Sequence, residues 1–420
     1  MEHAQPTKRK MLRVTLAGVF GTTLEFYDHF IYGSAAALVF PHVFFVQMSP
    51  SLALLLSLVT YSVAFVARPL GAVVFGHFGD RYGRKNVLIA ALLMMGVSTF
   101  LIGCLPSYAI AGSFGATALC FLRLFQGIAL GGEWGGAALI VNEYARDSKA
   151  KGLLGSVVQV ASPVGLLLAS ASFALLTDFT PPDFLLAGGW RIPFLASALL
   201  VLTGLYVRRG VDESPAFLEQ DRSQQAAPIV EVFKHHLKPV LLGIGTRVGS
   251  DTAFYVFTLF PLVYLPRLGV AEEVASMVGV FAALGQIVGT PVFGYCCDKW
   301  GTKKVLLAGA VANLVYGFAY FWLLDTTSTP VILAGAFVAL FLLSMAWAPL
   351  AAHLPALFPV EVRYTATSVS FQAAGIFGGA LAPSICLLLL DSTASGMVIA
   401  AYLGVTLVLA FFCTLKSNPR

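Results

Sequence analysis

Charged residues are scarce in this chain. Only 11% of its 420 residues are Asp, Glu, Lys or Arg, whereas 58% are hydrophobic. A soluble domain carries roughly a quarter charged residues, so this composition excludes an ordinary soluble protein. The apolar residues form long blocks, and the short alternating segments of a membrane β-barrel are missing. The sequence therefore predicts an all-α polytopic membrane protein.

Motifs of enzyme chemistry are also missing. The six cysteines, at positions 104, 120, 296, 297, 386 and 413, have neither metal-ligand nor redox spacing. We find no HExxH, no GxSxG and no nucleotide-binding P-loop, and the last absence argues against direct use of ATP. We therefore predict a protein that is not an enzyme and that needs no cofactor and no metal.

Twelve apolar blocks are long enough to cross a bilayer. The first follows the basic stretch KRKMLR without an evident cleavage site, which favours a retained helix over a signal peptide. The predicted spans lie near residues 14–41, 52–76, 87–105, 115–144, 152–176, 190–208, 239–265, 274–296, 305–324, 331–354, 365–390 and 395–415.

Basic residues are concentrated on one side of these spans. The side with both termini holds 21 of the 26 Lys and Arg, whereas the opposite loops hold Arg191 and Arg267. Such an imbalance places both termini in the cytoplasm. We expect a multi-pass protein of the cell (inner) membrane. The net charge of +5 thus reflects topology, and it requires no nucleic-acid partner.

The chain contains an internal repeat. "GAVVFGHFGDRYGRKNVL" (71–88) and "GTPVFGYCCDKWGTKKVL" (289–306) share nine residues in register, and the same offset of 218 carries Glu143 onto Glu361. Parallel six-helix halves are one architecture of secondary transporters. We predict an N-terminal six-helix bundle (1–208), a cytoplasmic linker (209–238) and a C-terminal six-helix bundle (239–420).

The first copy resembles the signature loop of the major facilitator superfamily. It reads Gly-His-Phe-Gly-Asp-Arg-Tyr-Gly-Arg-Lys over 76–85, and "FLRLFQGIALGG" matches the motif of the family's fourth helix. "GGEWGGA", "GWRIPF" and "EFYDHFIYG" narrow the resemblance to the metabolite:proton symporters, which carry shikimate, α-ketoglutarate, citrate or proline/betaine. Two features depart from that pattern: Lys299 and Thr302 replace arginines in the second loop, and no extended tail follows Phe412.

The resemblance implies a cytoplasmic gate built from the two signature loops. A carboxylate at the C-terminal end of a helix, such as Asp80, is unfavourable unless another group receives it. We expect Asp80 to meet the start of the eleventh span, and Asp298 to meet the start of the fifth near 148–152. A solvated loop that only sets topology is the alternative. The gating candidates are Asp80, Arg81, Arg84, Glu143, Asp298, Glu361, Arg363 and, as structural support, Arg68.

Carboxylates within the spans are candidates for proton coupling. Glu25 and Asp28 are three residues apart on one helix face, and two adjacent carboxylates in a low-dielectric site do not both ionise easily. Glu133 is the third candidate. The alternative is a permanent ion pair between one of them and Arg123. His29 turns about 100° away from Asp28 and is given no role.

Arginines within the spans are candidates for binding an anion, because the planar guanidinium matches a carboxylate. Arg123 and Arg247 are the candidates, although Arg247 could instead pair only with Asp251, four residues later. His353 is either packed, gating or ligand-bound. Further candidates for the wall of the substrate site are Tyr27, Tyr32, Trp134, Gln159, Asp251, Tyr255 and Trp347.

Glycines recur every four residues in the fourth span, at 127, 131 and 135 and at 132 and 136. Such spacing favours close helix contact, which we expect with the first span. That contact would gather the charged residues around one aqueous cavity.

These features predict a monomeric carrier in the lipid bilayer that imports a small organic anion together with protons, by rocking of its two halves. The resemblance favours a shikimate- or α-ketoglutarate-like carboxylate. Alternatives are a carrier of a zwitterion such as proline or betaine, an uncoupled facilitator, and a sensor descended from a carrier.

Overall fold

The computed structural model describes residues 8–82, 84–131, 151–181, 183–209, 228–359 and 362–419. Within these ranges the chain is almost entirely helical and contains no strand. Long apolar blocks form helices because a helix satisfies every backbone hydrogen bond internally.

Six long helical segments come from the first half of the chain. They are α1 (Lys8–Leu38), α3 (Pro50–Tyr82), α4 (Arg84–Cys104), α6 (Phe114–Gly131), the pair α8 (Lys151–Gln159) and α9 (Ala161–Phe179), and α10 (Arg191–Arg209). The short elements α2 (Phe40–Val43), α5 (Tyr108–Ala111) and η1 (Leu185–Gly189) lie in the connections.

The second half repeats this order after the short helix α12 (Pro228–His235). Its segments are α13 (Leu237–Thr258) with α14 (Pro261–Arg267), α15 (Glu272–Trp300), α16 (Thr302–Asp325), α17 (Thr329–Trp347) with α18 (Leu350–His353), α19 (Arg363–Gly375) with η3 (Ile376–Ala380) and α20 (Leu381–Thr393), and α21 (Gly396–Lys416). The short 3-10 helix η2 (Pro355–Leu357) follows α18.

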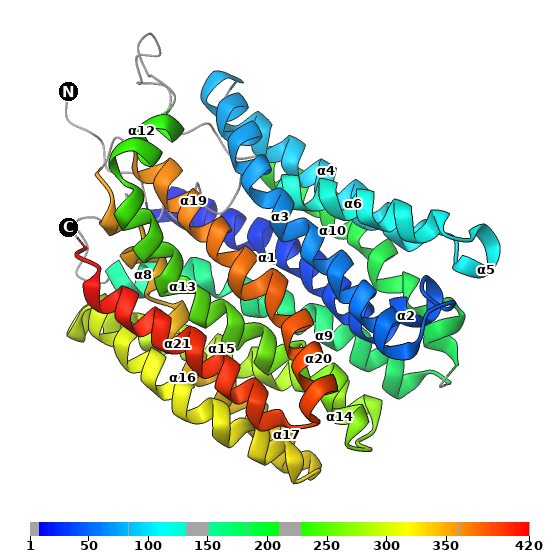
Figure 1. The fold of residues 1–420 in the computed structure, drawn as a ribbon. Coiled ribbons are helices and arrows are strands. Elements are labelled where there is room, and N and C mark those ends of the chain that lie inside the picture. The colour runs from blue at the N-terminus through cyan, green and yellow to red at the C-terminus, as the bar shows by residue number, and fades with distance from the viewer. Residues whose placement is uncertain are drawn as a thin grey trace.

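The helices account for twelve membrane spans. In the described part of the chain, nine are long and apolar enough to cross a bilayer, and a tenth is formed by α13 and α14, which meet at an angle of 41°. α1, which carries Glu25 and Asp28, and α4, whose apolar part is Ile89–Cys104, complete the twelve. α1 begins and α21 ends at the same end of the molecule, beside α12, as an even number of spans requires (Figure 1).

Two sets of helices join the halves. α15 packs against both α8 and α9, and α3 packs against α19, η3 and α20. The Oγ1 atom of Thr177 lies 3.1 Å from the Oγ atom of Ser276 at the end away from α12. The halves therefore contact each other on both sides of the molecular centre.

Gly127 and Gly131 of α6 contact α3 and not the first span, which corrects our expectation for these two glycines; Gly132, Gly135 and Gly136 lie outside the described residues. A Cβ atom on Gly127 would lie 2.2 Å from the Ala64 carbonyl oxygen, and one on Gly131 would lie 2.0 Å from the Arg68 carbonyl oxygen. Spacing of glycines indicates a close-approach face but not the partner that occupies it, and here α3 lies against that face.

Candidate substrate and proton site

A cavity lies where the two halves meet. This central cavity has a volume of about 60 Å³ and is lined from α1, α3, α6, α9, α13, α17 and α19. Its ionisable lining residues are Glu25, His29, Arg68, Arg247, Asp251 and Tyr255, and its other lining residues include Trp347 and Gln372. Ionised side chains inside a membrane protein are costly unless they face a cavity or one another, so this cluster is the candidate functional site.

Arg247 and Asp251 form a buried ion pair in the cavity wall. Arg247 Nη2 lies 3.0 Å from Asp251 Oδ2, and both side chains are almost fully buried. Arg247 Nη1 donates to the Phe371 carbonyl oxygen, whereas its Nε has no hydrogen-bond partner among the described residues. The ion pair between Arg247 and Asp251, which the sequence offered as an alternative to anion binding, is present. The Arg247 guanidinium nevertheless lines the cavity.

Arg68 lies in the cavity wall, although we expected it beside the cytoplasmic gate. It is the nineteenth of the 33 residues of α3, just past the middle of that helix. Its guanidinium lies 4.0 Å from the centroid of the Phe65 ring, and its Nε has no hydrogen-bond partner in the described ranges. α3 extends 14 residues further to Tyr82, or about 21 Å, so this side chain is remote from that helix end.

Asp28 belongs to a hydrogen-bonded chain within the N-terminal half. Thr99 Oγ1 donates to Asp28 Oδ2 over 2.9 Å, and Gln126 Nε2 donates to Thr99 Oγ1 over 2.7 Å. Arg123 Nη1 in turn donates to Gln126 Oε1 over 2.9 Å. We refer to Asp28, Thr99, Gln126 and Arg123 as the polar network. Since Glu25 lines the central cavity and Asp28 does not, the two carboxylates have different surroundings.

Arg123 is fully buried within the N-terminal half. Its guanidinium carbon lies 4.2 Å from the centroid of the Tyr32 ring and 4.9 Å from that of Tyr61. It lines neither the central cavity nor the outer cavity described below. The structure thus places this candidate substrate ligand behind the cavity wall, in the network that leads to Asp28.

His29 occupies the centre of the cluster, and sequence reasoning missed it. Its Nδ1 lies 3.0 Å from Arg123 Nη2 and 3.3 Å from Arg68 Nη2. Its Nε2 lies 2.7 Å from the hydroxyl of Tyr61 and 3.1 Å from that of Tyr255. Because His29 turns about 100° away from Asp28 on the helix, it points to these four side chains instead. The one clue in the sequence was that His29 directly follows the buried carboxylate of Asp28.

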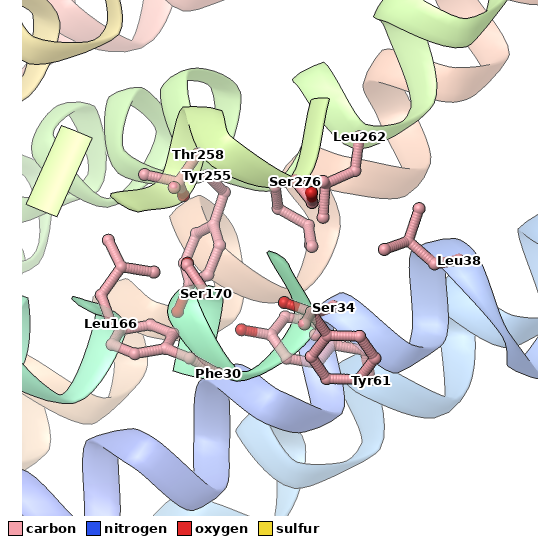
Figure 2. A pocket seen from close by; sticks show the side chains of 14 residues that line it. Phe30, Ser34, Leu38, Tyr61, Leu166, Ser170, Tyr255, Thr258, Leu262 and Ser276 are labelled. Carbon is pink, nitrogen blue, oxygen red and sulfur yellow. The ribbon is translucent and has the colours of Figure 1, made fainter. Parts of the chain in front are cut away.

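A second, smaller cavity lies on the side of the central cavity away from α12. This outer cavity has a volume of about 20 Å³ and shares Phe30 and Tyr255 with the central one. Figure 2 shows Tyr61, Tyr255 and Phe30 around it, together with Ser170 and Ser276. The aromatic side chains of Phe30 and Tyr255 therefore lie between the two cavities.

Three of the residues predicted to line the substrate site, Tyr27, Tyr32 and His353, lie in the protein core instead. Tyr27 donates to the Pro193 carbonyl oxygen over 3.1 Å, and Tyr32 donates to Thr60 Oγ1 over 2.7 Å, so both hydroxyls are bonded within the N-terminal half. His353 Nε2 lies 3.0 Å from Ser417 Oγ, at the end of α21. None of these three lines either described cavity.

Gln159 and Trp347 join the two halves beside the central cavity. Gln159 Nε2 donates to the Trp347 carbonyl oxygen over 3.2 Å, and Trp347 Nε1 donates to the Gln159 carbonyl oxygen over 3.3 Å. Pro163 lacks the N–H that would bond this carbonyl in a continuous helix, so the indole can take its place.

Asp298 binds the start of α8, where the internal repeat placed it. Its Oδ1 accepts from the Gly152 N–H over 2.6 Å and its Oδ2 accepts from the Leu153 N–H over 3.1 Å. The first N–H groups of a helix have no partner within it, and its positive end favours a carboxylate. Arg363 donates through Nε to the Phe358 carbonyl oxygen over 3.2 Å.

Several predicted residues cannot be placed. Glu133, Trp134, Glu143 and Glu361 lie outside the described residues. Asp80 and Arg81 lie in α3 and Arg84 begins α4, but the described part of the structure does not extend to these three side chains.

A bundle of apolar helices in two similar halves, with a buried ionic cavity between them, defines a secondary transporter. The chain belongs to the Major Facilitator Superfamily, whose sequence model matches residues 18–383 and 249–420. It is thus a multi-pass membrane transporter of the metabolite-carrying kind, and not an enzyme.

Comparison with characterised proteins supports this placement. The inner membrane metabolite transport protein YhjE of Escherichia coli K12 is 39% identical over 94% of this chain and 92% of its own length. The shikimate transporter of the same strain is 36% identical over 89% and 86%, and its proline/betaine transporter is 32% identical over 95% and 82%. The crystal structure of a D-xylose-proton symporter matches with a TM-score of 0.78 over 97% of this chain and 98% of that one, at 20% identity. That likeness shows the fold.

Proposed function

We propose that the protein imports a small organic anion together with protons. The observation that carries this proposal is the pair of guanidinium groups, Arg68 and Arg247, in the wall of the buried central cavity. Each has an Nε atom without a hydrogen-bond partner in the described ranges, and a guanidinium binds a carboxylate through paired donors. The 36% identity to a shikimate transporter supports a carboxylate of that kind.

The polar network supports coupling to protons. Asp28 is buried and accepts a hydrogen bond from Thr99, and the network connects it to Arg123. A carboxylate in such a place can exchange a proton as the cavity opens to one side and then to the other. Glu25, in the cavity wall, is the second candidate, and Glu133 stays a prediction.

The contacts between the halves support transport by alternating access. Asp298 with the start of α8, and Gln159 with Trp347, join the halves between the central cavity and the α12 end. Thr177 and Ser276 join them at the other end. We propose that the first set separates when the cavity opens toward α12 and the second set when it opens away.

A zwitterion is the second candidate substrate. The cavity wall carries Glu25 and Asp251 as well as the two arginines, so it presents both signs of charge. The 32% identity to proline/betaine transporters agrees with such a wall.

Proteoliposomes with the purified carrier test the function. We expect uptake of labelled shikimate, or of a related carboxylate from a panel, to exceed equilibrium under an inward proton gradient and to reach only equilibrium after the gradient is collapsed. Strong competition by glycine betaine or proline would favour the zwitterion. Accumulation that is unchanged without a proton gradient would contradict proton coupling, and equilibration alone in its presence would identify a facilitator.

We further infer an inner-membrane location, cytoplasmic termini and function as a monomer. An impermeant maleimide should label the exposed Cys104 in intact cells, and a cysteine at Asn418 only after permeabilisation, in variants with no other cysteine. The reverse pattern would invert the topology.

A further inference from the structure

His29 makes contacts that a packing residue does not need. Its side chain is 2% exposed and is surrounded by polar groups from three other helices. Tyr61 and Arg68 come from α3, Arg123 from α6, and Tyr255 from α13 in the C-terminal half.

The surrounding donors determine the tautomer of His29. A guanidinium can only donate hydrogen bonds, so Nδ1, which faces Arg123 and Arg68, must be an acceptor. In the neutral imidazole the single hydrogen then lies on Nε2, where the hydroxyls of Tyr61 and Tyr255, at 2.7 and 3.1 Å, share it as acceptors; Arg68 Nη2 lies further away, 3.5 Å from this nitrogen. The imidazole is therefore a neutral group whose two nitrogens have opposite roles.

These two roles join two parts of the molecule. The Nδ1 side is bonded to Arg123, the last member of the polar network that begins at Asp28. The Nε2 side is bonded to Tyr255, which lies in the wall of both cavities. Within the described ranges, no member of the polar network is hydrogen-bonded to the C-terminal half, so His29 connects the network to that half.

We propose that His29 is a positioning residue that transmits a change at Asp28 to the contact between the halves. This inference rests on the proton coupling proposed above. A proton on Asp28 removes the charge that orders Thr99, whose hydroxyl also lies 3.0 Å from the Met95 carbonyl oxygen and can turn to it. Gln126 and Arg123 then lose their fixed geometry, and the imidazole bound to Arg123 shifts relative to Tyr255. The charged and titratable groups around His29 are Glu25, Asp28, Tyr61, Arg68, Arg123, Tyr255 and, further along α13, Arg247 and Asp251.

Two substitutions separate the two sides of the imidazole. The amide of Asn reaches about as far as Nδ1, so His29→Asn can still accept from the arginines but loses the bond to Tyr255. The amide of Gln reaches about as far as Nε2, so His29→Gln can keep a partner for Tyr255. Tyr255→Phe removes the same bond from the other half, and Tyr61→Phe is its control within the N-terminal half.

The first experiment needs no substrate. Spin labels at Ser49→Cys and Thr326→Cys, in a variant without native cysteines, report the distance between the halves at the end away from α12. We expect His29→Asn and Tyr255→Phe each to raise the population of longer distances about fivefold or more, and the double variant to equal either single one. His29→Gln and Tyr61→Phe should resemble the wild type. Additive effects, or an unchanged distribution in His29→Asn, would overturn the link.

The second experiment asks whether the link serves coupling. In proteoliposomes, His29→Asn should lower the ratio of gradient-driven shikimate accumulation to shikimate counterflow without a gradient by about tenfold, whereas a role in substrate binding alone would lower both in proportion and leave this ratio unchanged. Normal gradient-driven accumulation in His29→Asn would overturn the role in coupling. If the wild type accumulates neither shikimate nor glycine betaine, the proposed function fails, and the spin-label distances still decide whether His29 links the halves.

Discussion

At the scale of single residues, Asp28 tests the proton site. We expect Asp28→Asn to lower accumulation under a proton gradient roughly ten- to a hundredfold but to leave counterflow nearly intact, because the amide can bond Thr99 but cannot carry a proton. Tyr27→Phe is the control, since its hydroxyl bonds the Pro193 carbonyl oxygen outside the network. Uptake into proteoliposomes measures both. Wild-type accumulation in Asp28→Asn would assign the proton to another carboxylate.

The pair of Arg247 and Asp251 gives a second test at this scale. Asp251→Asn leaves a buried guanidinium without its counter-charge, which costs about 3–5 kcal/mol in buried pairs, whereas removing both charges costs less. We expect a clear fall in melting temperature for Asp251→Asn and a recovery in the double variant Arg247→Gln/Asp251→Asn. The recovered double variant should still fail to be stabilised by carboxylates. Thermal unfolding in detergent measures each, and a double variant less stable than Asp251→Asn would contradict this account.

Residue types and spacing predict some of this site but not its connections. Buried charge must face a cavity, so Arg247, Asp251 and Glu25 could be assigned to the interior from the sequence. The neighbours of His29 could not be, because they come from α3, α6 and α13, and no pattern within α1 specifies which helices lie against it. Arg68 was expected to support the gate because it directly precedes Pro69 and the signature loop in the sequence, whereas α3 continues through Pro69 and places Arg68 in the cavity wall.

At the scale of helices, the contact between α3 and α6 depends on glycine. A methyl group on Gly127 would collide with backbone atoms of Ala64, which cannot turn aside as a side chain can. We expect Gly127→Ala to destabilise the carrier by roughly 1–3 kcal/mol, in the range of overpacked cores. Gly335→Ala is the control, since its nearest neighbour is the Leu323 Cδ1 atom at 3.2 Å. Thermal unfolding compares the two, and equal stability would show that α3 and α6 can move apart freely.

Hydropathy predicts the spans themselves well, because the bilayer demands long apolar helices. It does not predict their interruptions. The break between α8 and α9 at Val160, three residues before Pro163, places Gln159 beside Trp347, and the break between α13 and α14 bends that span by 41°. Such breaks arise from proline and from the packing of the opposite half, which hydropathy does not contain.

At the scale of the whole molecule, the internal repeat is the most informative part of the sequence. It predicted that Asp298 would lie at the start of the fifth span, and its carboxylate does accept from the N–H groups of Gly152 and Leu153. A symmetry between the two halves implies matching contacts, which is why this long-range contact could be predicted from the repeat; the side chain of Asp80, its counterpart, lies outside the described part of the structure. Its role as a gate is a proposal that the native cysteines can test.

Cys297, next to Asp298 and buried beside α8, reports whether the halves separate on this side. In a variant that keeps only Cys104 and Cys297, Asp298→Asn should speed alkylation of Cys297 by N-ethylmaleimide about fivefold or more, because a neutral amide holds the start of α8 less strongly. The exposed Cys104 should react at an unchanged rate. Removing a charge beside a thiol also alters its reactivity, so Asp298→Glu is needed: it keeps the charge but is too long for the same contact. Faster alkylation in both variants indicates opening of the halves, whereas faster alkylation in Asp298→Asn alone indicates only a change at the thiol and contradicts the gate.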